Sequence, residues 1–152
     1  MAIKSKKNGE HGELSVAQLL HEMGYWVHIT QRNRSGSQPV DIIAVKHSSM
    51  SAFGKREEDV AWLLDAKYVE SGERFDFSDI QPNQIDSLRM ARDFAHLGNI
   101  GFGIIFAEFS TEFVYFLPFD LYEKLVAQGK KSVHRIDIAT IDEWEAVVLC
   151  LR

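Results

Sequence analysis

Hydrophobic and polar positions recur along the chain with two different periods, and these periods predict its elements. From Gly12 to Met23 the apolar residues are spaced three or four positions apart, which is the spacing of one helix face. Gly24 follows directly and provides a helix stop. Short apolar runs bounded by turn-forming residues predict strands. The expected strands are Tyr25–Ile29, Asp41–Val45, Ala61–Tyr68, Ile100–Phe109 and Glu112–Leu117, with a short extended piece near Val133–Ile138.

Further segments show a helical pattern. Asn83 can cap a helix that runs to about Leu97, and two more helices are expected over Pro118–Gln128 and Ile141–Leu149. Ser71–Pro82 is expected to be a loop, and His47–Asp59 a loop or a hairpin tip. This order of elements predicts an α/β or α+β domain in which a mixed β-sheet is flanked by helices.

A single domain is expected over residues 10–152. The chain has 152 residues, and no repeat or Pro/Gly/Ser-rich stretch divides it. Residues 1–9 are polar and basic, so we expect them to form a flexible arm. Trp26, Trp62 and Trp144 lie in apolar segments and are expected in the core.

The composition fits a soluble globular protein, with 45% hydrophobic and 26% charged residues. No apolar run approaches the roughly 18 residues of a membrane span, so no membrane association is expected. The N-terminal segment has no apolar stretch of the kind found in signal peptides. The single cysteine, Cys150, cannot form an internal disulfide, and a cytoplasmic location is the default expectation.

The formal net charge of −5 argues at first against a nucleic-acid partner, because phosphate binding needs clustered Lys and Arg. The distribution weakens that argument. Residues 1–34 carry five bases and three acids, whereas residues 35–118 carry seven bases and thirteen acids. Acids that bind a divalent metal would be neutralised by the ion. The net charge therefore does not exclude DNA as a partner.

The candidate chemistry lies in two neighbouring predicted strands. Asp65 and Lys67 are two residues apart on a strand, so both side chains point to the same face. Asp41 opens the preceding strand, and antiparallel pairing of the two strands would bring Asp41 close to Asp65. Two facing carboxylates repel unless a cation or proton intervenes, and Mg²⁺ or Mn²⁺ suits oxygen ligands. Taken singly, an Asp-x-Lys pair is more often a surface salt bridge and Pro-x-Asp more often a turn, so the prediction depends on their combination.

In this combination the sequence resembles the PD-(D/E)xK nuclease superfamily and, within it, the RecU-type Holliday junction resolvases. The resemblance covers about residues 9–123. It rests on a first helix with an acidic residue, a metal-binding aspartate, an acid-x-Lys strand, a glutamine-bearing helix and a following strand pair. These correspond to Gly12–Leu20, Asp41, Leu63–Lys67, Phe77–Leu88, Ile100–Phe106 and Val114–Pro118.

The resemblance implies a restriction-endonuclease-like core and a mechanism with a metal ion, Mg²⁺ or Mn²⁺. In such a mechanism Asp41, Asp65 and the Ala66 carbonyl hold the ion, and Lys67 positions or activates the attacking water. Glu13 would bind a second ion directly or through water, or would simply be a favourable acid near a helix N-terminus. Gln84 would orient Lys67 or the phosphate, or would only be a polar residue in the first turn of its helix.

Basic residues outside this constellation are candidates for DNA contacts. Arg32 and Arg34 lie in the turn before Asp41 and are expected to contact phosphates beside the cleavage site. Lys4, Lys6 and Lys7 could follow the DNA backbone, although a solvated tail is the commoner explanation for such a run.

Two departures from the RecU pattern leave the substrate open. Asp65 stands where those enzymes usually have Glu, and Ile29–Pro39 is too short for their protruding stalk. The leading hypothesis is a homodimeric DNA endonuclease that resolves Holliday junctions in recombination or repair, of a compact length that suits a phage-encoded enzyme. A restriction-like or general DNA nuclease of the same superfamily is the first alternative, favoured by the missing stalk. The second is a non-catalytic DNA-binding protein that retains the fold.

Overall fold

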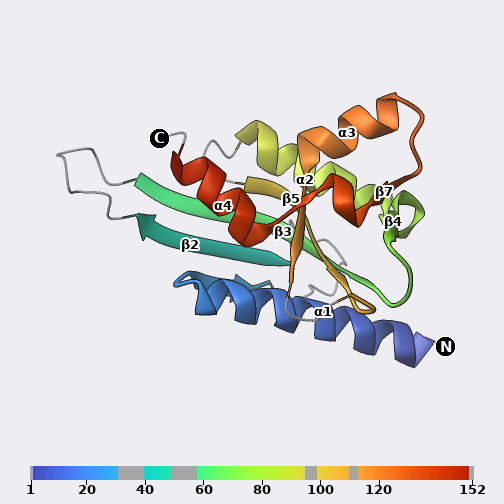
Figure 1. Ribbon diagram of the computed structural model, residues 1–152, viewed down its shortest axis with the longest axis horizontal. Helices are drawn as coiled ribbons and strands as arrows, with labels where there is room; N and C mark the ends of the chain where they lie inside the picture. The colour runs from blue at the N-terminus through green and yellow to red at the C-terminus, as the bar shows by residue number, and fades with distance from the viewer. Residues whose placement is uncertain (1, 31–39, 49–57, 95–98, 110–112, 151–152) are drawn as a thin grey trace.

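A six-stranded mixed β-sheet forms the centre of the protein (Figure 1). The computed structural model describes residues 2–30, 40–48, 58–94, 99–109 and 113–150. Strands β3 and β5 are parallel, and the other neighbouring strands of this sheet are antiparallel. In spatial order the strands are β1 (Trp26–Ile29), β2 (Ile42–Ser48), β3 (Glu58–Val69), β5 (Asn99–Phe106), β6 (Tyr115–Pro118) and β8 (Ala139–Thr140).

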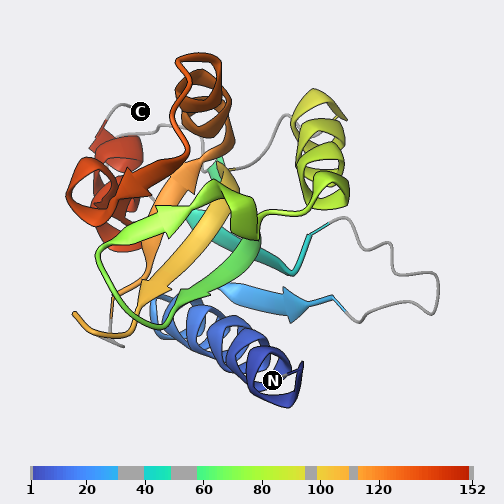
Figure 2. The same ribbon diagram turned by 90° about the vertical axis from the view of Figure 1, so that its right-hand side faces the viewer.

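Helices cover both faces of the sheet, which confirms the expected α/β architecture. Helix α1 (Ala2–Glu22) lies along one side, and α2 (Pro82–Phe94) and α3 (Phe119–Ala127) lie on the other (Figures 1 and 2). Helix α4 (Ile141–Cys150) packs Trp144 into the same hydrophobic cluster as α1.

Two hydrophobic clusters form because successive strand residues point to opposite faces of the sheet. Trp62 and Leu64 of β3 are fully buried beneath α1, where they meet Val16 and Leu20. Leu63, between them in sequence, packs into the second cluster under α2 and α3. The alternation therefore places consecutive residues of β3 in different cores.

Helix α1 ends where the sequence predicted but begins earlier. Gly24 has a φ of 94°, Gly24 N donates to His21 O, and Tyr25 N donates to Leu20 O. These two bonds form a Schellman C-cap, which needs a residue with positive φ. The helix was expected to start at Gly12, with residues 1–9 as an arm, but its backbone is helical from Ala2. This stretch contains no proline, and its glycines lower helix propensity by only about 1 kcal/mol each.

Strands β2 and β3 form the hairpin that the sequence left open as an alternative to a loop, since Ser48 pairs with Glu58. The prediction of a loop over Ser71–Pro82 was wrong in part. Strand β4 (Arg74–Asp76) pairs with β7 (Ser132–His134) in a small second sheet, and a 3₁₀ turn (Phe77–Asp79) follows it. Phe75 of β4 is buried in the second cluster, which anchors this segment to the domain.

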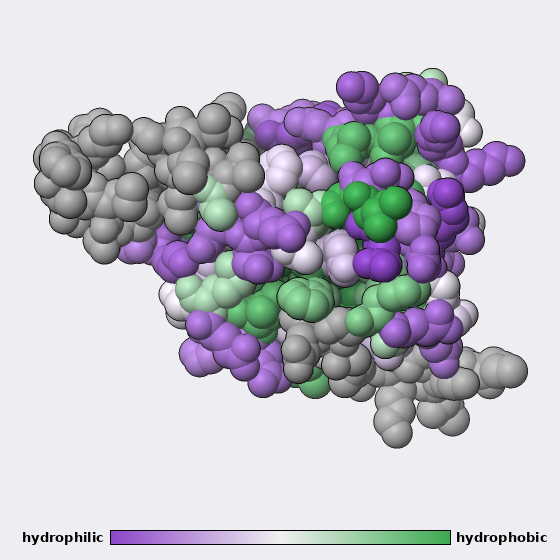
Figure 3. Space-filling view, in the orientation of Figure 1, coloured by the Kyte–Doolittle hydropathy of each residue, from purple (hydrophilic) through white to green (hydrophobic). Residues whose placement is uncertain are grey.

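The expectation of three core tryptophans was wrong for Trp26. Trp62 is fully buried and Trp144 is half-buried, whereas Trp26 is 64% exposed. Strand β1 is an edge strand, and α1 covers only the face that carries Val27 and Ile29. On the view of Figure 3, exposed hydrophobic residues lie in small patches between hydrophilic ones.

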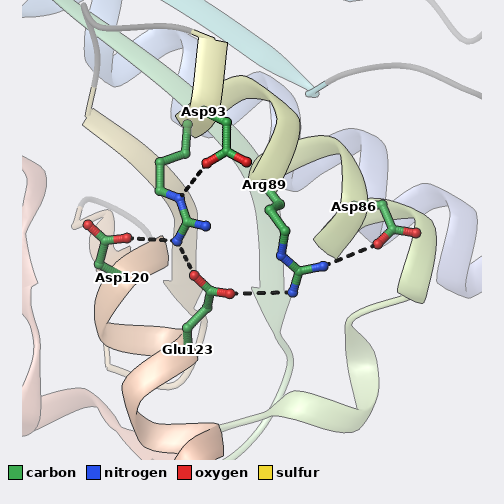
Figure 4. A network of polar contacts seen from close by, with 6 residues as sticks. Asp86, Arg89, Asp93, Asp120 and Glu123 are labelled. Atoms are coloured by element: carbon green, nitrogen blue, oxygen red, sulfur yellow. Dashed lines mark hydrogen bonds and ion pairs between the residues drawn. The ribbon is translucent and has the colours of Figure 1, made fainter.

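A network of ion pairs joins α2 to α3 (Figure 4). Arg92 pairs with Asp93 on its own helix and with Asp120 and Glu123 on α3. Arg89 bridges Asp86 and Glu123, at 3.5 and 3.3 Å. The network connects α2 to α3 on the surface of the domain. Within the described residues, no helix is both long and apolar enough to cross a membrane.

Candidate functional site

The pairing of β2 with β3 brings Asp41 and Asp65 together. Ile42 pairs with Leu64 in an antiparallel register, and Asp41 directly precedes β2. Asp41 N donates to Leu64 O at 3.1 Å, one residue off that register, so the backbone of Asp41 leaves the regular ladder but stays beside β3. The charge of Asp41 and a side-chain hydrogen bond between the two acids both raise the pKa of Asp65, so the two carboxyl groups lie close together at the end of β2, as the sequence predicted.

Asp41 is held in place through both its backbone and its side chain. Thr30 N donates to Asp41 O at 2.9 Å, and Ala66 N donates to Asp41 Oδ2 at 3.0 Å. The second bond exists because β2 ends at this point while β3 runs on to Val69. Among the described strands, none pairs with β3 on that side beyond Leu64. The carboxylate of Asp41 thus takes the place of the missing strand partner of Ala66.

Asp65 is a buried carboxyl group in an unfavourable setting. The residue is only 3% exposed, and its Oδ2 has no hydrogen-bond partner among the described residues. Burial, followed by the negative charge of Asp41, raises the pKa of Asp65 from 3.8 to about 8, against an opposing effect of Lys67. A buried carboxylate without full compensation costs roughly several kcal/mol. The ionised form of Asp65 therefore destabilises the folded protein.

Lys67 is oriented by the start of helix α2. Its Nζ donates to Gln84 Oε1 at 2.7 Å and lies 3.5 Å from the Asp79 carbonyl oxygen. Gln84 Oε1 also accepts from Gln81 N at 3.0 Å, and Gln81 precedes the first residue of α2. A side chain in the third helical position that bonds back to the N-cap amide is half of a capping box. Gln84 thus combines the two roles that the sequence left as alternatives.

Glu13 belongs to α1, which covers the opposite face of the sheet from α2 and α3. Its charge contributes to the raised pKa of Asp65. The approach is close because α1 crosses β3 at a glycine: a Cβ at Gly12 would lie 3.4 Å from the Cβ of Tyr68. Glu13 is half-buried at this crossing. Glu13 of the first helix therefore interacts electrostatically with Asp65 of the acid-x-Lys strand.

The oxygen atoms at this site suit a hard divalent cation. Within the described residues, no three His, Cys, Asp or Glu side chains form a group that could hold a metal ion. The oxygen donors available at the site are the carboxyl groups of Asp41 and Asp65 and a backbone carbonyl. Backbone groups of alternate strand residues point to the same edge, so the Ala66 carbonyl points toward the β2 side, as Leu64 O does. Mg²⁺ usually binds through one or two carboxylates and keeps several waters, and the unpartnered Asp65 Oδ2 fits such an ion.

The predicted DNA-binding residues are placed only in part. Arg32 and Arg34 lie outside the described residues. Lys4, Lys6 and Lys7 belong to the first turns of α1 instead of the expected arm. Their assignment to DNA contacts stays a prediction.

Sequence reasoning missed three contributors to the site: Thr30, the Asp79 carbonyl and the amide of Gln81. Thr30 clamps the backbone of Asp41, with Thr30 Oγ1 donating to Val40 O. The groups of Asp79 and Gln81 that contribute are backbone atoms, and the type of residue at a position does not reveal a contact made by its backbone. The only available signal was the position of Gln84 three residues after Gln81, which is the spacing of a capping box.

The chain matches no model of a known protein family, and no curated protein matches it either.

Proposed function

We propose that the protein is a metal-dependent DNA endonuclease with a restriction-endonuclease-like core, in which Asp41, Asp65 and Lys67 form the active site. The observation that carries this proposal is Asp65: it is buried opposite a second carboxylate, with one oxygen lacking any partner among the described residues. Such an arrangement destabilises the protein on its own and is relieved by a cation. Strongly perturbed acids of this kind concentrate at functional sites.

The chemistry follows from the residues present. Asp41, Asp65 and the Ala66 carbonyl would hold a Mg²⁺ or Mn²⁺ ion. Such an ion would polarise a phosphodiester and make water more acidic. Lys67, fixed by Gln84 at 2.7 Å, would place its ammonium group against the negative charge that develops on the phosphate during attack. Glu13 would add negative charge near Asp65 and favour the binding of a cation.

A purely DNA-binding protein explains the same residues less well. A binding module gains nothing from a buried acid beside a second one, since neither supplies positive charge to phosphate. Removal of Asp65 would improve the stability of such a module, because burial and the charge of Asp41 both disfavour its carboxylate. The retention of two acids and an oriented lysine therefore favours catalysis.

The substrate class follows from the resemblance to RecU-type resolvases. A resolvase makes two symmetric cuts in a four-way junction, so a homodimer that presents two such sites would be required. The short connection between Ile29 and Asp41 favours duplex cleavage as the second candidate, because it leaves no room for the stalk of those enzymes.

One assay tests the proposal and separates the substrates. The protein is incubated with labelled four-way junction, linear duplex and single-stranded DNA, each with Mg²⁺, Mn²⁺ or EDTA. Paired symmetric nicks in the junction alone support the resolvase, and cleavage of linear duplex supports the general nuclease. Absence of cleavage with either metal on all three substrates would reject the proposal.

A further inference from the structure

Two aromatic side chains stand exposed on the edge strand β1. Trp26 is 64% exposed, and its ring is parallel to that of His28, with an interplanar angle of 6° and a centroid distance of 6.0 Å. Residues two apart on a strand share a face, so both rings stand on the same face of β1 with their planes parallel. A single exposed apolar residue on a protein surface is ordinary. Two exposed rings held parallel on a strand of four residues are a more specific arrangement.

This aromatic pair lies on the same face of the sheet as the candidate active site. Trp26 pairs with Val45 and His28 with Ile43, and Ile43 in turn pairs with Leu63 of β3. On β3 the same face carries Leu63 and, two residues later, Asp65. Along the strands Trp26 is four positions and His28 two positions from the level of the acids, which corresponds to about 13 Å and about 7 Å. The larger distance corresponds to about four nucleotides at the stacking distance of DNA.

Among the described residues, the strand surface between the two features carries no carboxylate. From the Asp41–Asp65 end to the ion pair of His47 with Asp59, the described residues on this face of β1, β2 and β3 include no Asp, Glu, Lys or Arg. These residues are Trp26, His28, Thr30, Ile43, Val45, Ala61 and Leu63. A polyanionic strand could therefore cross this face without meeting an acidic side chain, in a protein whose net charge is −5.

We propose that Trp26 and His28 form a stacking site for the unpaired bases of single-stranded DNA; this inference rests on the proposed nuclease function of the neighbouring site. Bases are available to an aromatic face only when they are unpaired, and each stacked base contributes about 1–3 kcal/mol. The site would hold a single-stranded segment beside the phosphodiester that is cut, such as the unpaired nucleotides of a branched or frayed substrate.

The test is the affinity for a fluorescein-labelled oligothymidylate of about 15 nucleotides, measured by anisotropy in EDTA so that no cleavage occurs. Trp26→Ala is expected to bind about tenfold or more weakly, and Trp26→Phe to retain affinity within about threefold of wild type. His28→Ala, which also affects an exposed position, should weaken binding in the same direction. Leu14→Ala is the matched control, because Leu14 is 62% exposed but lies on α1, across the sheet. Thermal melts establish that each variant is folded.

Each outcome decides the proposal. Wild-type affinity in Trp26→Ala, or no binding of the oligonucleotide by wild type, would overturn it. A Trp26→Ala variant that loses self-association in sedimentation while its affinity is unchanged would assign the face to a second copy of the chain and also overturn it. Cleavage with Mg²⁺ is measured separately. If Trp26→Ala binds more weakly but wild type does not cleave DNA, the stacking site is supported and the nuclease is rejected. If wild type cleaves DNA but Trp26→Ala binds as wild type does, the nuclease is supported and the stacking site is rejected.

Discussion

Lys67 Nζ donates a hydrogen bond of 2.7 Å to Gln84 Oε1, and this bond connects the central strand of the candidate site to the first turn of helix α2. The same oxygen caps α2 through Gln81 N. The orientation of the lysine therefore depends on the helix, and the helix N-terminus depends on the residue that orients the lysine.

Gln84→Ala is expected to lower both stability and cleavage. Loss of the cap should cost about 0.5–1 kcal/mol of unfolding free energy, and a misplaced Lys67 should slow cleavage by about tenfold or more. Urea unfolding and single-turnover cleavage measure the two effects. Asn83→Ala is the control, since Asn83 is exposed in the same helical turn. Equal cleavage rates in the two variants would show that Gln84 does not orient Lys67.

Asp65 should make the metal-free protein less stable as the pH rises. Its pKa is raised to about 8 in the folded state, from 3.8 in the absence of the fold. Between these values the folded state binds a proton that the unfolded state has lost, so stability falls from about pH 4 to about pH 8 and then levels off. Asp65→Asn cannot ionise and should lack this decline.

The measurement is the difference in unfolding free energy between Asp65→Asn and wild type in EDTA. This difference should favour the variant increasingly from pH 5 to pH 8, by about 1 kcal/mol or more at the upper end. Titrating groups that do not interact with Asp65 affect both proteins alike and cancel, whereas Asp41, Lys67 and Glu13 contribute to the difference through Asp65. A difference that stays constant with pH would contradict the burial and charge effects assigned to Asp65.

Divalent metal should reverse this order of stability. An ion that binds only the folded protein stabilises it by about 2.7 kcal/mol at a concentration a hundred times its dissociation constant. Mg²⁺ or Mn²⁺ should therefore raise the melting temperature of wild type and leave Asp41→Asn and Asp65→Asn nearly unchanged. Asp137→Asn, at an exposed acid in the turn after β7, should respond like wild type. An equal rise in all four proteins would indicate non-specific binding.

Arg92 should stabilise the contact between α2 and α3. Arg92→Ala breaks the contacts to Asp93, Asp120 and Glu123 and removes a guanidinium that lies 5.1 Å from the Phe119 ring centre. We expect a loss of about 1 kcal/mol, smaller in about 1 M NaCl because salt screens such pairs. Arg74→Ala is the control, since Arg74 is exposed and its side chain donates a hydrogen bond to Ser132 Oγ on β7. A loss no larger than the control's would show that the network does not hold α2.

Local sequence patterns predicted most of the fold. The stop at Gly24, the strand over Ala61–Tyr68 and the helix near Asn83 depend on residues close in sequence, so their signals are local. The pairing of β4 with β7 joins Arg74 to His134, and no local pattern indicates a contact over that separation. The exposure of Trp26 has a similar origin: an apolar strand has two faces, and only the tertiary arrangement decides which of them a helix covers.

The candidate site was predictable to the extent that it depends on side chains in strand register. Asp41, Asp65 and Lys67 required only the assumption that their strands are antiparallel neighbours, which β2 and β3 are. The burial of Asp65 and the clamp of Thr30 on Asp41 depend on packing and on backbone atoms, which the sequence does not display.

The most direct test of the proposed active site compares DNA cleavage by wild type, Asp65→Asn and Asp137→Asn in Mg²⁺, with binding of the same DNA measured in parallel. The account predicts cleavage by wild type and by Asp137→Asn, and no cleavage by Asp65→Asn, which still folds and binds DNA. Full cleavage by Asp65→Asn, or equal cleavage by wild type in Mg²⁺ and in EDTA, would contradict it.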